Sequence, residues 1–369
     1  MPRLLMPATA VQFEFEFYGV VPQDFGGEET PAGYGIYNLS DGVLALASWY
    51  PILAVYDQDG WNLDAVSPIG DSVYSDIALY SIDLTVDENL VVVATGVQTG
   101  NLVSGGRTRL HYESGPVRDF FLVASPDFKI ASQTLGETTV NSYYLPGNQA
   151  GGDQALEVGL GSLRIFSQKF GPYPFTEMDI VDAPMRNAQG VEYPGIMLIG
   201  DSLYEAPEKP DFSVTVAHEV AHQWWYSVVG NDVFEEPWLD EALATYSPGL
   251  YYEYVLGQAY QDGLVEYWQG RYDQLLTDGN DDLVTGSLSH FESLSNPRVY
   301  GTVVYVKGAL FLKALRERIG DEAFFQALKE YYQANLFKIA RGANLLDAFE
   351  RTYRKQLDAF YQVWLYSTH

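Results

Sequence analysis

Hydrophobic and polar residues alternate with a period of two along the first third of the chain. The stretch 12–18, Gln-Phe-Glu-Phe-Glu-Phe-Tyr, places an aromatic side chain at every second position, as expected for a strand with one buried face. Turn-forming residues separate further candidate strands, which are predicted at 77–86, 90–94, 107–111, 119–124 and 138–144. This spacing predicts a mostly antiparallel β-sheet domain in the N-terminal part of the chain.

A helical period replaces the alternation after the loop at 145–152. Leu156, Leu160 and Leu163 recur at helical spacing, and Asp153 stands where it could cap the N-terminus of that helix. Two strand-like segments follow at 178–181 and 196–199, and from residue 213 onward the chain is largely helical, with helices near 260–276 and 302–319.

These patterns predict an α+β protein with two domains. A linker near 125–130 divides an N-terminal, mostly antiparallel β-sheet domain (1–127) from a largely helical domain (128–369).

A metal-binding pattern lies within the helical part, in the run Val-Ala-His218-Glu219-Val-Ala-His222-Gln. Two His four residues apart lie on one face of a helix, so both imidazoles can bind one metal ion. Glu219 faces the same cavity and can take a proton from a water molecule that the metal activates. Because the chain has only 5 His, the pattern would arise by chance in about a few of a thousand such chains.

Glu241 supplies a third candidate ligand, with eighteen residues between it and His222. A catalytic zinc site commonly has two His, one carboxylate and one open position. A short helix, a turn and a second, antiparallel helix fit into this interval and would return Glu241 to the two His. We therefore predict zinc bound by His218, His222 and Glu241.

The chain resembles the gluzincin aminopeptidases, the group that includes aminopeptidase N and leukotriene hydrolase. Three segments carry the resemblance: His218-Glu219-Val-Ala-His222, Trp238-Leu-Asp-Glu241-Ala, and Tyr300-Gly-Thr-Val-Val-Tyr305-Val-Lys-Gly-Ala309. The resemblance implies a thermolysin-like zinc metallopeptidase domain with one zinc ion and Glu219 as general base. It also implies that the Tyr305 hydroxyl binds the oxyanion, with Tyr300 as its neighbour. Relative to the family, the N-terminal β-sheet domain (1–127) is short at its N-terminal end.

A fourth segment departs from the family's pattern. Where the family has a Gly-x-Met-Glu-Asn loop, the chain reads Gln189-Gly190-Val191-Glu192-Tyr193. A Gly and the Glu remain, whereas Gln189 replaces the first Gly, Val191 the Met and Tyr193 the Asn. The resemblance makes Glu192 the carboxylate that binds the substrate's free amino group, with Gly190 beside it. The expected substrates are therefore peptides with a free N-terminus.

Composition narrows the choice of partners and metal ligands. A formal charge of −28 argues against nucleic acid and anionic membranes as partners. No apolar stretch is long enough to span a membrane, and the N-terminus lacks the apolar core of a signal peptide, so we expect a soluble protein without membrane insertion. With 0 Cys, a metal must be bound by His and carboxylates. The compartment and the oligomeric state stay open.

Two alternatives compete with an aminopeptidase. The chain stops about where the family's catalytic domain ends, so we expect the family's C-terminal helical domain to be absent and the cleft to be more open. An open cleft would suit a zinc endopeptidase. The other alternative is a non-catalytic, zinc-containing scaffold that binds peptides. The presence of Glu219 and Tyr305 argues against the scaffold, because a structural zinc site needs no general base.

Overall fold

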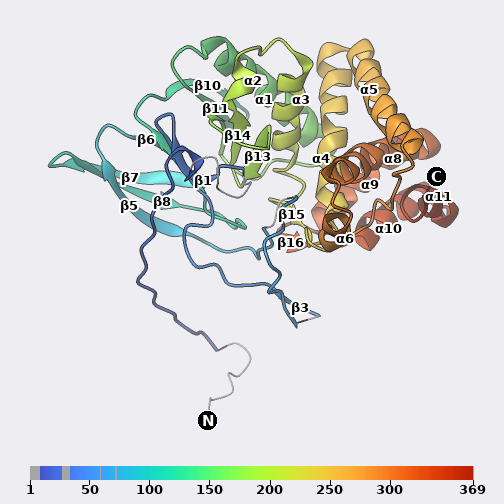
Figure 1. Cartoon of the computed structure of the whole chain (residues 1–369), viewed down its shortest axis with the longest axis horizontal. Coiled ribbons are helices and arrows are strands. Elements are labelled where there is room, and N and C mark those ends of the chain that lie inside the picture. The colour runs from blue at the N-terminus through green and yellow to red at the C-terminus, as the bar shows by residue number, and fades with distance from the viewer. Residues whose placement is uncertain (1–8, 27–33, 59, 71–72, 369) are drawn as a thin grey trace.

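The computed structural model describes residues 9–26, 34–58, 60–70 and 73–368. The antiparallel N-terminal strands lie on one side of the molecule, a mixed sheet lies at the centre, and the C-terminal helices lie on the other side (Figure 1). Among the described residues, no helix combines the length and the apolar character that a membrane span requires.

Two antiparallel sheets form the N-terminal region, as the alternating pattern predicts. One has the order β1-β2-β9-β6 and the other the order β5-β8-β7. Their strands are β1 (Tyr37–Ser40), β2 (Val43–Leu46), β5 (Ser81–Asp87), β6 (Val91–Ala94), β7 (Val97–Ser104), β8 (Arg107–Glu113) and β9 (Leu122–Ser125). A short pair, β3 (Tyr56–Asp57) and β4 (Gly60–Trp61), lies apart from both sheets.

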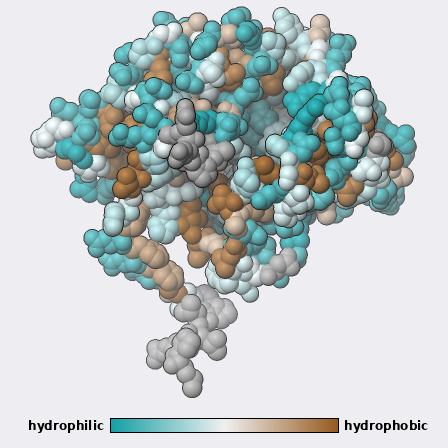
Figure 2. Space-filling view, in the orientation of Figure 1, coloured by the Kyte–Doolittle hydropathy of each residue, from teal (hydrophilic) through white to brown (hydrophobic). Residues whose placement is uncertain are grey.

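The strand predicted at 12–18 is wrong. Residues 9–20 are described, yet they adopt no regular structure, and the side chains of Phe13, Phe15 and Phe17 are 70%, 64% and 51% exposed. Alternation gives a segment strand propensity, but a strand also needs a neighbouring strand to bond with. Figure 2 shows hydrophobic surface in the lower part of this face, toward the N-terminal stretch.

Two further strands begin later than predicted. The strand expected from residue 77 begins at Ser81, and before it Ala78 makes only an isolated bridge to Val117. The strand expected from Asp119 begins at Leu122, because the backbone N–H of Phe120 donates to the Asp119 carboxylate at 2.6 Å instead of joining the ladder.

The central sheet is mixed and has the order β10-β11-β12-β14-β13. Its strands are β10 (Lys129–Leu135), β11 (Thr138–Tyr144), β12 (Glu177–Ala183), β13 (Gly190–Tyr193) and β14 (Ile196–Gly200). Side chains of β2, β9, β12 and β14 share one hydrophobic cluster, so the four-stranded sheet packs against the central sheet. The domain boundary at residue 127 stays a prediction.

Helix α1 (Gln149–Lys169) packs against the central sheet through β10, β11 and β12. It begins four residues before Asp153, so the prediction that Asp153 caps this helix is wrong. Asn148 occupies the N-cap position, although its side chain donates to Asp182 at 2.7 Å rather than bonding the helix.

The remaining elements form the helical part. They are α2 (Asp201–Tyr204), α3 (Pro210–Ala221), α4 (Trp238–Tyr251), the π-helix η2 (Tyr252–Leu256), α5 (Gln258–Thr277), α6 (Leu288–Ser293), α7 (Pro297–Tyr300), the π-helix η3 (Gly301–Lys307), α8 (Gly308–Ile319), α9 (Asp321–Ala334), α10 (Gly342–Tyr353) and α11 (Asp358–Trp364), with β15 (Val229–Gly230) paired to β16 (Lys338–Ile339). Helix α4 contacts α1, α3, α5, α8 and η3. It is therefore the centre of the helical core.

Candidate active site

Helices α3 and α4 pack against each other and position the predicted metal ligands. Pro210 occupies the first turn of α3, where its missing N–H is not needed. His218 lies in the last turn, and His222 follows directly as the C-cap. The interval before α4 holds β15 and irregular loops, so the short helix predicted there is wrong. Glu241 nevertheless returns to the two His, from the first turn of α4.

Three ligand atoms form a small triangle. Nε2 of His218 and Nε2 of His222 are 3.2 Å apart, and Oε2 of Glu241 lies 3.4 Å from the first and 3.5 Å from the second. A tetrahedral ion with bonds of about 2.0–2.1 Å holds neighbouring ligand atoms about 3.3–3.4 Å apart. The triangle therefore has the size of one face of a zinc coordination sphere.

The backbone fixes the orientation of the His222 ring. Its Nδ1 lies 3.1 Å from the carbonyl oxygen of Trp225. A carbonyl can only accept, so Nδ1 carries the proton and Nε2 presents its lone pair to the other two ligand atoms. Such outer contacts hold metal-binding imidazoles in their ligating form.

The site gathers carboxylates without a permanent cation. Glu192, Glu219 and Glu241 have no Lys or Arg partner among the described residues, and the ion pairs of Glu192 and Glu241 are with His. Burial, and then the charge of Glu192, raises the pKa of Glu219 well above its usual value. Burial likewise raises the pKa of Glu192. A divalent cation would relieve this crowding of negative charge.

Burial and neighbouring charges shift the pKa values of the predicted ligands in opposite directions. Burial would raise the pKa of Glu241, but the neighbouring imidazoles of His218 and His222 outweigh it and lower that pKa. Burial lowers the pKa of His218. Burial also acts to lower the pKa of His222, but there the charges of Glu192, Glu241 and Glu219 prevail and raise it. In addition, Oε2 of Glu241 is buried and accepts no hydrogen bond within the described structure. A metal ion would satisfy that oxygen.

Tyr305 lies beside the ligands, as predicted. It comes from the π-helix η3, and such segments often occur at functional sites. Its hydroxyl donates to Oε1 of Glu241 at 2.6 Å, and its ring stacks on His218 with a centroid distance of 6.0 Å. Tyr300 contacts Tyr305 edge to face at 5.6 Å. The structure thus brings Tyr305 and Tyr300 to the metal ligands.

Glu192 and Gly190 come from β13, which contacts α3. Oε1 of Glu192 lies 3.5 Å from Nδ1 of His222. Gly190 touches the general-base candidate, because a Cβ atom at this position would lie 2.4 Å from Oε1 of Glu219. Glu192 and Gly190, which lie in the segment that departs from the family's pattern, therefore both reach the site.

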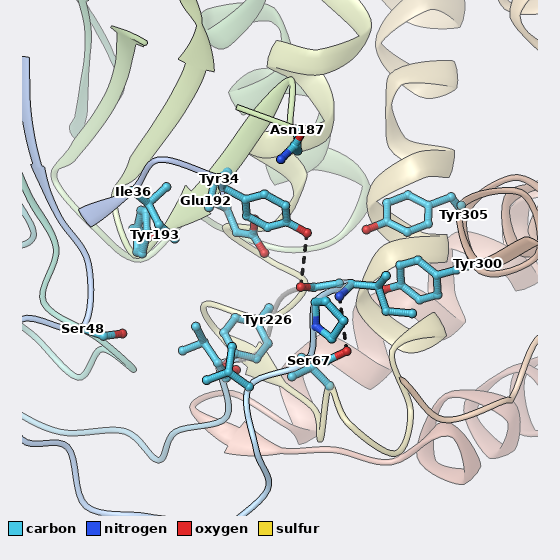
Figure 3. A pocket seen from close by; sticks show the side chains of 18 of the residues that line it. Tyr34, Ile36, Ser48, Ser67, Asn187, Glu192, Tyr193, Tyr226, Tyr300 and Tyr305 are labelled. Carbon is cyan, nitrogen blue, oxygen red and sulfur yellow. Dashed lines mark hydrogen bonds between the residues drawn. The ribbon is translucent and has the colours of Figure 1, made fainter. Parts of the chain in front are cut away.

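A pocket of about 780 Å³ opens beside these residues. Glu192 and Tyr193 line one side of it, and Tyr300 and Tyr305 line the other (Figure 3). Tyr34 lies across the pocket, and its hydroxyl donates to the carbonyl of Gly70 at 3.2 Å. The volume suits a ligand the size of a short peptide.

Sequence reasoning missed several of these residues. The Trp225 carbonyl belongs to the backbone, so no residue type marks it. Tyr34, Gly70 and Arg271 line the pocket from segments far from the motifs. Their place depends on tertiary packing, and no local pattern signals it.

Comparisons with known proteins bear directly on this region. The model of the peptidase family M1 domain matches residues 154–364, more than half of the chain and all of the residues named above as metal ligands. Aminopeptidase M1-B of Oryza sativa subsp. japonica is 26% identical over 374 residues, which cover 94% of this chain and 42% of that protein. Aminopeptidase N of Streptomyces lividans is 28% identical over 226 residues, covering 58% of this chain and 26% of that protein. The chain thus spans less than half the length of these relatives.

Solved structures resemble the fold. A two-domain M1 zinc metallopeptidase bound to L-arginine gives a TM-score of 0.66 at 22% identity, covering 80% of this chain and 65% of that chain. An M1 zinc metallopeptidase from Deinococcus radiodurans bound to a Tyr-Ser-Ala substrate gives a TM-score of 0.63 at 22% identity, covering 79% and 64%. This chain therefore shares the fold of these structures over 80% and 79% of its length.

Proposed function

Because the chain belongs to peptidase family M1, we propose that it is a zinc-dependent aminopeptidase that removes residues from the amino terminus of peptides. The observation that carries the proposal is the triangle of buried ligand atoms from His218, His222 and Glu241, with sides of 3.2–3.5 Å. The aminopeptidases among its relatives and the zinc metallopeptidases among the similar structures support it.

The donor set fits zinc. Two neutral imidazoles and one carboxylate leave the fourth tetrahedral position open. The buried Oε2 of Glu241 accepts no hydrogen bond within the described structure, and a bound metal ion would be its missing partner. Zinc held by His218, His222 and Glu241 would supply Lewis-acid chemistry, which acidifies the attacking water and polarises the scissile carbonyl.

Glu219 is the proposed general base. Its carboxylate is buried beside the predicted ligands, and burial raises its pKa, which strengthens it as a proton acceptor. It takes the proton of the attacking water and delivers it to the departing amine. The nitrogen then leaves as a neutral amine rather than as an unstable anion.

Tyr305 and Glu192 act on the substrate itself. The Tyr305 hydroxyl, which donates to Glu241 in the free protein, donates to the oxyanion that forms at the attacked carbonyl. Glu192 accepts hydrogen bonds from the substrate's terminal ammonium, which places the first peptide bond over the ligands. The preferred substrates are therefore peptides with an unblocked amino terminus.

Glu219→Gln tests the proposal in a single variant. The substitution removes the base but keeps the size of the side chain, so we expect turnover of a peptide to fall by about 10²–10⁴-fold while one zinc per chain is retained. The measurements are release of the first residue and metal content. Glu266→Gln is the matched control, because Glu266 is exposed on α5.

Two results would contradict the proposal. A Glu219→Gln protein that hydrolyses peptides as fast as the unaltered protein has no general base at this position. A zinc-loaded, unaltered protein that binds peptides without cutting them is a scaffold instead.

A further inference from the structure

Four charged side chains line the pocket: Arg118, Asp119, Glu192 and Arg271. Arg118 is 1% exposed and donates to three backbone carbonyls, those of Ser75, Tyr226 and Lys338. It joins the N-terminal region to the β15–β16 pair, and each of its three nitrogens donates to one of these carbonyls. Asp119 accepts from the Tyr50 hydroxyl at 2.6 Å. Arg118 and Asp119 thus maintain the wall of the pocket.

Arg271 is different. It projects from helix α5, is partly exposed, and donates only weakly, to the hydroxyls of Tyr267 and Thr302 at 3.3 and 3.4 Å. No carboxylate pairs with it among the described residues. In a chain with 49 acidic residues and 21 basic ones, Arg271 therefore brings a positive charge without an acidic partner to the pocket lining.

Arg271 is attached to the helical segment that carries Tyr305. Its hydrogen-bond partner Thr302 is buried in the π-helix η3, three residues before Tyr305. Arg271 therefore stands on the Tyr300–Tyr305 wall. Glu192 lies on the wall that faces Tyr300 and Tyr305 (Figure 3). A peptide whose amino group binds Glu192 and whose first peptide bond lies by Tyr305 extends its remaining residues toward the second wall.

We propose that Arg271 forms a carboxylate-binding subsite for the part of the peptide that leaves. This inference rests on the proposed aminopeptidase function and extends it to the choice of substrate. A guanidinium presents two parallel N–H donors that match a carboxylate, and it remains charged at any working pH. It also offsets the repulsion that an acidic peptide meets at a surface of this net charge.

Two groups could supply the carboxylate. One is the C-terminal carboxylate of a short peptide, which would make the enzyme selective for length. The other is an Asp or Glu side chain after the scissile bond, which would make it selective for sequence.

Paired peptides with a free amino terminus test the subsite and separate the two sources. The first set compares tripeptides and hexapeptides as C-terminal acids and as C-terminal amides. The second set compares C-terminal amides that carry Glu or Gln at the third position. We expect one set to show a preference of at least about tenfold in kcat/KM for the carboxylate form, expressed mainly in KM, as a charged hydrogen bond confers.

Variants assign the preference to Arg271. We expect Arg271→Gln to abolish it while hydrolysis of the carboxylate-free peptide stays within about twofold, and Arg271→Lys to retain part of it. Arg298→Gln is the matched control, because Arg298 is a nearby arginine that pairs with Asp278 at 3.1 Å outside the pocket lining. This control should keep the full preference.

The proposal fails if the unaltered protein treats both members of every pair alike. It also fails if Arg271→Gln slows both members equally, or if Arg298→Gln removes as much of the preference as Arg271→Gln does. Calorimetric binding of the same pairs distinguishes this failure from that of the enzyme function. Carboxylate-dependent binding without cleavage overturns only the aminopeptidase, whereas cleavage without carboxylate preference overturns only the subsite.

Discussion

The catalytic side and the recognition side of the candidate active site are built in different ways. The catalytic side places His218, His222, Glu241 and Tyr305 on helical segments that pack together within one hydrophobic core. The recognition side combines β13 with Tyr34 and the loop 66–70, which come from separate parts of the chain. The groups that make and break bonds tolerate little displacement, so they are carried by packed helices. Substrate recognition is carried here by irregular segments as well, as is common in proteins.

Besides the contact of Gly190 with Glu219, the two sides meet closely at Gly70. The loop that ends at Gly70 is attached by the Tyr34 hydroxyl, and a Cβ atom added at Gly70 would lie 2.6 Å from the hydroxyl oxygen of Tyr300. Gly70 also has a φ of 66°, a conformation that favours glycine. The recognition side therefore reaches the catalytic side where only a glycine fits.

The largest effect should come from the anchor of the catalytic side. Lys307, at the end of η3, is fully buried and donates to both carboxylate oxygens of Asp281 at 2.9 and 3.1 Å. Lys307→Met leaves the Asp281 carboxylate without its ammonium partner, so we expect a loss of about 3–5 kcal/mol in the free energy of unfolding. Urea titration measures it. Lys313→Met, which breaks an exposed pair, should cost less than about 1 kcal/mol; equal losses would show that the buried pair is no anchor.

Tyr305→Phe should have the next largest effect, and on rate rather than stability. Removing one oxyanion donor typically raises the barrier by about 2.7–4 kcal/mol, so we expect kcat to fall by 10²–10³-fold with little change in KM. Steady-state kinetics on a peptide with a free amino terminus measures it. Tyr300→Phe, which alters the neighbouring ring only, should reduce kcat by less than about tenfold. If the two variants are equally slow, the oxyanion role of Tyr305 is wrong.

Glu192→Gln should affect the recognition side alone. Losing a charged hydrogen bond costs about 1.5–3 kcal/mol, so kcat/KM for free-amine peptides should fall by roughly ten- to a hundredfold, mainly through KM. Zinc content should stay at one per chain. A variant that loses kcat and metal together would mean that Glu192 belongs to the catalytic side.

The smallest expected effect is a shift in the pH at which zinc is released. The charge of Glu192 raises the pKa of His222, and a proton on that ring competes with the metal. Because the pKa of His222 is raised, protons compete with zinc at a higher pH than they otherwise would. Glu192→Gln removes the charge and should lower this pKa, so zinc should stay bound down to a lower pH. Metal content across a pH series measures the midpoint. A midpoint that moves upward in the variant would contradict the electrostatic link between the two sides.

The catalytic side was the more predictable from sequence. The spacing of His218, Glu219 and His222 depends only on the geometry of one helix, and Glu241 was recognised by its motif although the intervening helix was wrong. The strand at 12–18 failed because alternation does not say whether a partner strand exists. Arg271 and Tyr34 were missed because their role arises from contacts across the fold. Local periodicity thus predicts elements, whereas the recognition side depends on how distant segments meet.

Hydrolysis of one peptide, with its amino terminus either free or acetylated, tests the central claim most directly. With zinc-loaded protein, we predict that only the free form is cut and that its first residue is released, because Glu192 requires an ammonium group. Cleavage of both forms at internal bonds would contradict the account and identify an endopeptidase.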